Sequence, residues 1–224
     1  MPREHPERMS ADFGIGAALA RIQPGRPLVI VDADEVLLRF VAGFDQFLRR
    51  QGLFLDLVSY RLHGNVKRID DRTPVLDVEV TALLEEFRRE LDWLEAVEGA
   101  RASLDALAGS ASIAVLTNIT PEQAIARARN LQRLGLDFPL VANSGLKGPA
   151  VKHLAGHASG PVWFIDDIPQ QLASAAEHAP EVMRIHLVGD RRLKPLLPPS
   201  PHANLYAEDW AAALAFIQSR LDKA

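Results

Sequence analysis

The chain has 224 residues, enough for one large domain or for a core domain that carries a smaller one. A net charge of -4 without a long basic run offers no surface for nucleic acid, and the absence of cysteine excludes disulfides and thiolate chemistry. No apolar stretch approaches the roughly 20 residues that a membrane-spanning helix needs, so we expect no membrane partner. The lack of cysteine fits the cytoplasmic location that we expect.

The N-terminal part of the chain contains the first strong strand signal. Residues 1–26 are predicted to form a lead-in that joins the core and is disordered over its polar start, MPREHPERMS. The short apolar run from Pro27 to Asp32 is typical of a buried parallel strand, and it ends in an acid. A helix is expected next, with an apolar face formed by Phe40, Phe44, Phe47 and Leu48.

The next segment does not continue with a clear strand. Residues 53–77 have an irregular pattern, and a second helix is expected after them, with an apolar stripe from Val80 to Leu94. Two helices without an intervening strand indicate an insertion. We therefore predict a helical cap over residues 41–97, in which the aromatic side chains of the first helix serve for packing.

From Gly99 onward, apolar strands alternate with helices. Helices are expected at 100–108, 121–135, 148–157, from Pro169, and from Trp210 to Leu221, and strands at 111–117, 138–142, 162–166 and 183–188. The sequence Thr120-Pro121-Glu122-Gln123 is a strong helix start. This alternation predicts an α/β fold whose core, residues 27–40 and 98–224, is a Rossmann-like doubly wound parallel sheet.

Polar side chains follow several of these strands. Ligands of open parallel sheets bind beyond the carboxyl ends of the strands, and the residues expected there are Asp32, Asp34, Thr117, Asn118, Lys147, Asp166 and Asp167. Four clustered carboxylates repel one another unless a cation lies among them. Because only oxygen ligands are offered, that cation is expected to be Mg²⁺.

Each of these groups suits phosphoryl transfer. A cation screens an anionic nucleophile from an anionic phosphate. Lys147 and the Thr117 hydroxyl could hold phosphate oxygens as negative charge develops. A second carboxylate two residues after the nucleophile, Asp34, could protonate the leaving group and then activate water.

The order of these motifs resembles that of the haloacid dehalogenase superfamily. Along the chain come Asp-x-Asp, a strand-ending Thr, a Lys and Asp-Asp, and the likeness covers residues from about 27 to 190. The position of the insertion is similar to that of the helical-cap subgroup. The resemblance implies a Mg²⁺-dependent phosphatase in which Asp32 is the nucleophile and becomes an aspartyl-phosphate, and Asp34 is the general acid and base.

The resemblance also implies the binding residues. Thr117, Asn118 and Lys147 would bind phosphate, and the metal would be held by Asp32, Asp34, Asp166 and Asp167, with Asp167 the more direct ligand and Asp34 facing the metal through its main-chain carbonyl. Two features depart from the simplest match. Val36 stands where many members have Thr, and Lys152 competes with Lys147, which we favour because it opens a helix.

Several functions share such a site. Asp34 favours phosphoester chemistry, because members of the superfamily that dehalogenate generally lack an acid there. We expect a phosphatase acting on a small phosphorylated metabolite. A phosphotransferase such as a sugar-phosphate mutase is the alternative, since it would share every core residue. A receiver-type module would place its acidic pair first and its lysine last, whereas here Asp166 and Asp167 follow Lys147. A non-catalytic binding protein would need none of these groups, and here all of them are present. The sequence leaves the substrate and the oligomeric state open.

Overall fold

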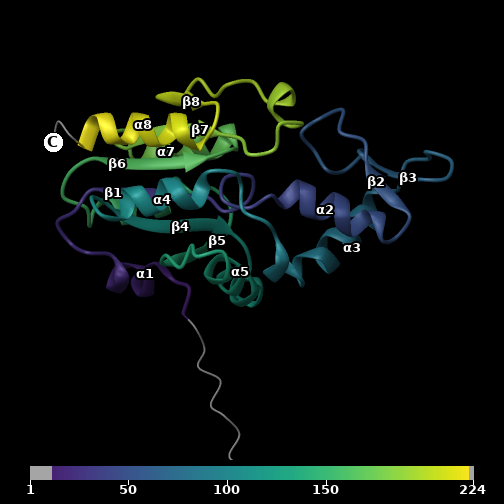
Figure 1. The fold of residues 1–224 in the computed structure, drawn as a ribbon, viewed down its shortest axis with the longest axis horizontal. Helices are drawn as coiled ribbons and strands as arrows, with labels where there is room; N and C mark the ends of the chain where they lie inside the picture. The colour runs from purple at the N-terminus through teal and green to yellow at the C-terminus, as the bar shows by residue number, and fades with distance from the viewer. Residues whose placement is uncertain (1–11, 222–224) are drawn as a thin grey trace, which may run out of the picture.

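The structure is a computed structural model that describes residues 12–221. Its core is one six-stranded sheet in which every neighbouring pair of strands is parallel (Figure 1). In the order in which they pair, the strands are β5 (Leu140–Asn143), β4 (Ser112–Asn118), β1 (Leu28–Val31), β6 (Val162–Asp166), β7 (Met183–Leu187) and β8 (Leu205–Ala207).

Helices cover both faces of the sheet, because its central strand is apolar on both sides. In β1, Val29 and Val31 belong to one buried layer, and Leu28 and Ile30 belong to the other. The first layer includes side chains of α4 (Ala100–Ala108), α5 (Pro121–Arg133) and α8 (Trp210–Leu221), and the second those of α1 (Ile15–Arg21), α6 (Gly148–Ala155) and α7 (Pro169–His178). The predicted doubly wound α/β fold is confirmed.

The order of the strands reverses at β1. The chain places β4 and then β5 on one side of β1, and β6, β7 and β8 on the other. In sheets of this kind the ligand crevice forms beyond the carboxyl ends of the strands at the point of reversal. The segment between β1 and α4 lies at that end of the sheet, where α2 and α3 project away from the core (Figure 1).

This projecting segment contains more than the two predicted helices. It holds α2 (Phe40–Arg49), α3 (Asp77–Arg88) and a 3-10 turn, η1 (Leu91–Trp93), and between the helices lies an antiparallel pair, β2 (Leu53–Leu55) and β3 (Val66–Arg68). The prediction of an irregular segment without strands is therefore wrong here. Each strand has only three residues, too few to produce a visible alternation, and a side chain of α2 supports the pair: Asp45 accepts a 2.9 Å hydrogen bond from the Leu55 N–H.

One aromatic side chain forms the centre of this projecting segment between β1 and α4, which we call the inserted segment. Phe87 of α3 is fully buried, and its ring centroid lies 5.1 Å from that of Phe40, 5.3 Å from Phe44 and 5.5 Å from Phe47. Tilted and edge-on arrangements at these distances are favourable for aromatic rings. The aromatic face of α2 thus serves for packing, as its spacing predicts.

The N-terminal part differs from its prediction. The disorder expected for MPREHPERMS falls outside the described residues, but residues 12–26 include helix α1, which was not predicted. Ala18 and Ile22 are buried in the core, and the Phe13 carbonyl accepts a 2.9 Å hydrogen bond from Ala142 N–H. The edge strand β8 and the turn η2 (Lys194–Leu196) were also not predicted. None of the described helices has the length and apolar character that would let it cross a membrane.

Candidate active site

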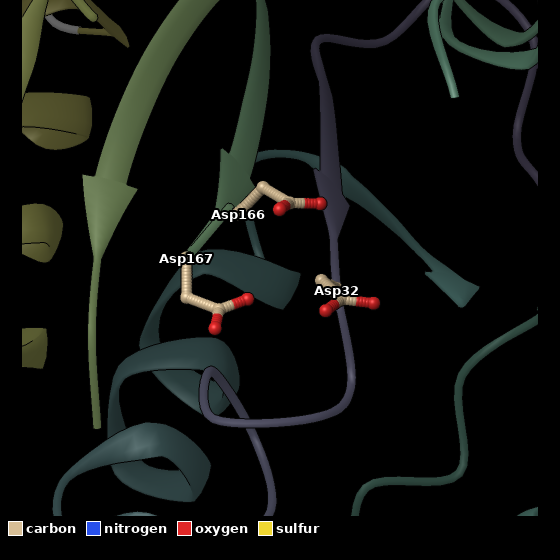
Figure 2. A group of neighbouring side chains, drawn as sticks. All are labelled: Asp32, Asp166 and Asp167. Carbon is tan, nitrogen blue, oxygen red and sulfur yellow. The ribbon is translucent and has the colours of Figure 1, made fainter. Parts of the chain in front are cut away.

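Three carboxylates from two neighbouring strands meet at the carboxyl end of the sheet. Asp32 follows β1, Asp166 ends β6, and Asp167 comes directly after it (Figure 2). All three are buried, and one oxygen of each lies within 4.8 Å of an oxygen of both others. They converge because β1 and β6 are paired in parallel, so that their ends lie at one edge.

Lys147 holds two of these carboxylates. Its Nζ atom lies 2.6 Å from Asp32 Oδ1 and 2.7 Å from Asp166 Oδ2. Burial acts to lower the pKa of Lys147, but the charges of Asp166 and Asp32 outweigh it and raise this pKa above its usual value. The residue comes just before α6, where its backbone N–H donates to Gln171 Oε1 at 2.8 Å. Lys152, the other lysine considered, is exposed on α6.

The remaining carboxylate oxygens fit a hard divalent cation. Both oxygens of Asp166 are engaged, Oδ2 by Lys147 and Oδ1 by the Ile168 N–H at 2.8 Å. Asp167 accepts at Oδ2 from the Tyr60 hydroxyl at 2.8 Å. Burial first, and then the charges of Asp166 and Asp32, raise the pKa of Asp167 well above its usual value. A bound cation would relieve this repulsion, and an all-oxygen donor set suits Mg²⁺.

The backbone at Asp167 is fixed by a buried histidine. His186 of β7 accepts a 3.1 Å hydrogen bond at Nδ1 from the Ser200 N–H, so that Nε2 carries the proton. Nε2 then donates to the Asp167 carbonyl at 2.8 Å. The imidazole therefore orients the segment that bears the carboxylates and does not enter their cluster.

Asp34 is paired with a buried arginine that the sequence analysis missed. Arg127 of α5 is fully buried, and its Nη2 lies 2.6 Å from Asp34 Oδ1 in an ion pair whose orientation falls outside hydrogen-bond geometry. The Nε and Nη1 atoms of Arg127 have no hydrogen-bond partner among the described residues. The available signal was its position, three residues after Ala124 and four before Leu131, on the buried face of the helix.

The end of β4 supplies the predicted hydroxyl and amide. Thr117 is buried, and β4 pairs with β1, so that Thr117 and Asn118 lie at the same edge as Asp32. The Asn118 amide donates to the Gly145 carbonyl at 2.8 Å and accepts from Asn143 Nδ2 at 2.7 Å. The Asn118 side chain thus ties the strand end to the loop that precedes Lys147.

These groups open into a pocket of about 420 Å³ between the core and the inserted segment. This volume lies in the range of small-molecule sites. The core contributes Asp32, Asp34, Glu35, Thr117, Asn118, Lys147, Asp167, Ile168, Gln171 and Leu193, and the inserted segment with its hinge contributes Phe40, Val41, Tyr60, Arg61, Leu62, His63, Leu84 and Arg88. Tyr60, which contacts Asp167, was not predicted to belong to the site.

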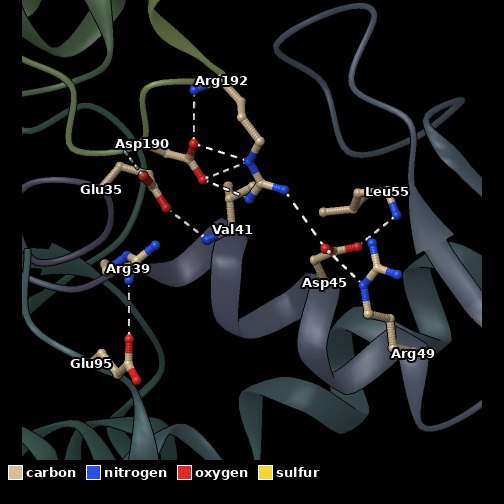
Figure 3. Close-up of polar contacts among 9 residues, drawn as sticks. All are labelled: Glu35, Arg39, Val41, Asp45, Arg49, Leu55, Glu95, Asp190 and Arg192. Carbon is tan, nitrogen blue, oxygen red and sulfur yellow. Dashed lines mark hydrogen bonds and ion pairs between the residues drawn. The ribbon is translucent and has the colours of Figure 1, made fainter.

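A buried glutamate marks the hinge between the two parts (Figure 3). Glu35 has a positive φ of 59°, and its carboxylate accepts hydrogen bonds from the Val41 N–H at 2.6 Å and the Asp190 N–H at 3.0 Å. Burial raises the pKa of Glu35 to about 8, more than these two N–H groups lower it. One side chain therefore joins the start of α2 to the loop after β7.

A second contact crosses the same hinge. Arg192 pairs with Asp190 at 2.7 Å, and its Nη1 lies 3.6 Å from Asp45 Oδ2 in α2 (Figure 3). Because Asp190 and Arg192 belong to the core loop, this arginine connects that loop to the inserted segment. The Arg192 side chain is 43% exposed, so the contribution of this contact to stability is small.

Comparisons with known proteins define the class of fold. No protein-family model and no curated protein matches the sequence. Solved structures do match: a haloacid dehalogenase-like hydrolase from Burkholderia xenovorans is 15% identical, with a TM-score of 0.55 over 88% of this chain and 99% of that one. A hydrolase of this type from Bacillus subtilis, bound to magnesium, is 13% identical, with a TM-score of 0.57 over 87% and 99%. An L-2-haloacid dehalogenase is 12% identical, with a TM-score of 0.58 over 86% and 100%. The chain therefore has the fold of the haloacid dehalogenase-like hydrolases.

Proposed function

We propose that the protein is a Mg²⁺-dependent phosphatase that hydrolyses a small phosphomonoester through an aspartyl-phosphate on Asp32. The observation that carries this proposal is the position of Asp32. Its Oδ1 is fixed 2.6 Å from the buried ammonium of Lys147, in a pocket shared with the carboxylate of Asp167. A nucleophile held by a cation in a small pocket suits attack on an anionic phosphate.

The chain supplies a residue for each proton and bond. In the first step, a carboxylate oxygen of Asp32 would attack phosphorus while the ester P–O bond breaks, and Asp34 would give its proton to the departing alcohol. In the second step, Asp34 would take a proton from water, which then displaces the carboxylate of Asp32 and releases inorganic phosphate. Lys147 and Thr117 would hold the non-reacting phosphoryl oxygens.

The metal would lie among the same carboxylates. Asp32 and Asp167 each keep an oxygen that is not bound to Lys147 or Tyr60, and these two residues would hold the ion directly. Asp166 is expected from the resemblance to be a further ligand, but both of its oxygens are engaged, so in this proposal it would position Lys147. Asp34 would keep its expected role of facing the metal through its main-chain carbonyl. When bound, Mg²⁺ would screen the charges of nucleophile and phosphate and polarise the phosphoryl oxygens. The magnesium in the Bacillus subtilis structure supports this choice of ion.

Asp34 favours ester hydrolysis over dehalogenation. A departing halide needs no proton, whereas a departing alkoxide does, and Asp34 lines the pocket beside Asp32. Because an L-2-haloacid dehalogenase has the same fold, ester hydrolysis and dehalogenation should be measured side by side. A phosphotransferase would use the same residues and would differ in passing the phosphoryl group to an acceptor other than water.

The test is a substrate panel with matched lysine variants. Phosphate release from 4-nitrophenyl phosphate and from alkyl phosphates would be measured with and without Mg²⁺, beside halide release from L-2-chloropropionate. We expect Mg²⁺-dependent phosphate release, lowered about 100-fold or more in Lys147→Met but unchanged in the exposed Lys152→Met. Halide release without phosphate release by a folded protein would replace the proposal with dehalogenation. Phosphate transfer to an added alcohol that exceeds hydrolysis would indicate the phosphotransferase.

A further inference from the structure

The two walls of the pocket differ in the ionisable residues that they contain. The core side contains four acidic residues, Asp32, Asp34, Glu35 and Asp167, together with Lys147. The residues that line the pocket from the inserted segment include two arginines and a histidine, and none of them is acidic. Apart from the hinge residues Phe40 and Val41, the set from this segment is Tyr60, Arg61, Leu62, His63, Leu84 and Arg88. An anion bound against this wall would meet no repulsion from it.

The lack of acidic residues on this wall of the pocket does not reflect a lack of acidic residues in helix α3. The helix has four acidic residues, and none of them lines the pocket: Asp77, Glu79, Glu85 and Glu86. Its last residue, Arg88, does line the pocket, together with Leu84 four residues earlier. Residues with this spacing share one face of a helix, so α3 turns its basic and apolar positions toward the site and its acidic positions away from it.

The second arginine lies in the loop that contacts Asp167. Arg61 directly follows Tyr60, whose hydroxyl is 2.8 Å from Asp167 Oδ2. Among the described residues, no carboxylate lies within ion-pair distance of Arg61 or Arg88. Three other arginines of the inserted segment are paired with acids, namely Arg49, Arg68 and Arg72. Arg50 and Arg89 have no acid at this distance among the described residues either, but they do not line the pocket.

We propose that Arg61 and Arg88 bind a second anionic group of the substrate, at the end remote from the scissile phosphate. The substrate class is then a phosphomonoester with a short body that ends in a carboxylate or a second phosphate. Phe40, Leu84 and Leu193 line the pocket as well and provide apolar contact for such a body. Arginine pairs with both kinds of anion, often through two parallel hydrogen bonds. This inference rests on the proposed phosphatase function.

The test compares three esters that differ only at the far end. These are propyl phosphate, the same ester ending in a carboxylate, and the same ester ending in a second phosphate. The wild-type protein should prefer at least one acidic ester over propyl phosphate by about tenfold or more in kcat/KM. In the double variant Arg61→Gln/Arg88→Gln this preference should fall about tenfold, chiefly through KM. Whichever acidic ester loses its advantage identifies the anion.

Arg89→Gln is the matched control, because Arg89 is the next residue, is exposed and does not line the pocket. It should keep the wild-type preference. The inference is overturned when the wild-type protein treats the three esters alike, or when the double variant keeps the preference for the acidic ester.

A protein without phosphatase activity would still allow a decision. If no ester is hydrolysed, the proposed function fails, and binding of the carboxylate-ended ester to the wild-type protein and the double variant is measured by calorimetry. Affinity about tenfold weaker in the double variant supports the anion site on its own. Equal affinity overturns it.

Discussion

The Nη2 atom of Arg127 lies 2.6 Å from Asp34 Oδ1, which connects the interior of α5 with the residue that we propose as acid and base. Arg127 is fully buried, whereas 31% of the Asp34 side chain is exposed, on the side of the pocket. The pair therefore fixes one carboxylate oxygen against the helix and leaves the other open to a substrate. None of the three guanidinium nitrogens of Arg127 has a hydrogen-bond partner among the described residues, so burying this cation is costly and the ion pair with Asp34 is what compensates its charge.

Removing the cation should destabilise the fold through the charge left behind. We expect Arg127→Met to lower the free energy of unfolding by about 3 kcal/mol, because Asp34 then remains partly buried without a partner. The double variant Arg127→Met/Asp34→Asn should recover much of this loss. Urea unfolding of the four proteins in the cycle gives the coupling energy. Additive losses would show that the two side chains do not interact.

The proposed proton-transfer role of Asp34 predicts that the effect of its removal depends on the leaving group. Asp34→Asn should slow hydrolysis of alkyl phosphates, which have poor leaving groups, by about 100-fold or more, and should slow 4-nitrophenyl phosphate much less in the first step. Burst kinetics separate phosphorylation of the enzyme from its hydrolysis. If both ester types suffer alike in the first step, Asp34 does not act as the acid.

Glu35 should make stability depend on pH. Its pKa is raised from 4.5 to about 8 in the folded protein, so the native state keeps a proton that the unfolded chain releases. Stability from this residue is therefore fully present below about pH 4.5 and is lost as the pH rises toward 8. The slope should reach up to about 1.4 kcal/mol per pH unit within this window.

The variant Glu35→Gln cannot lose a proton and should show a shallower slope between pH 5 and 7 than the wild-type protein. Urea unfolding at several pH values measures the difference. Glu85→Gln, an exposed change on α3, should keep the wild-type slope. Parallel curves for wild type and Glu35→Gln would mean that Glu35 is ionised in the folded protein.

The carboxylate cluster should lower the stability of the protein without Mg²⁺ and raise it when Mg²⁺ binds. Without Mg²⁺, Asp167→Asn should raise the melting temperature, because it removes a buried charge that Asp166 and Asp32 repel. Saturating Mg²⁺ should stabilise the wild-type protein by RT ln(1 + [Mg²⁺]/Kd) and have little effect on the variant. The exposed Asp92→Asn serves as the control. An equal magnesium-dependent shift in wild type and Asp167→Asn would remove Asp167 from the metal site.

The sequence predicted which residues meet at this edge of the sheet because strand ends are easy to locate. The apolar runs before Asp32, Thr117 and Asp166 identify buried parallel strands, and parallel strands bring their carboxyl ends to one edge. Lys147 lies in the cluster for a related reason, since it precedes the helix that leads into β6. Local patterns were sufficient for these residues.

The parts that were missed depend on tertiary contacts. The helical period of α5 places Arg127 on its buried face, but its pairing with Asp34 is a tertiary contact that no local pattern indicates. Tyr60 reaches Asp167 across 107 residues of sequence, from a loop without periodicity. The strands β2 and β3 have three residues each, and their pairing is supported by an ion pair of 2.6 Å between Lys67 and Asp56.

The central claim is that Asp32 carries the phosphoryl group. The most direct measurement is acid quenching of the protein after rapid mixing with 4-nitrophenyl phosphate and Mg²⁺, followed by borohydride reduction and peptide mass spectrometry. An acyl phosphate at Asp32 would be reduced there, and Asp32→Asn should show neither this product nor turnover while keeping its fold. Phosphate on another side chain, or Mg²⁺-dependent turnover by Asp32→Asn equal to that of the wild-type protein, would contradict the account.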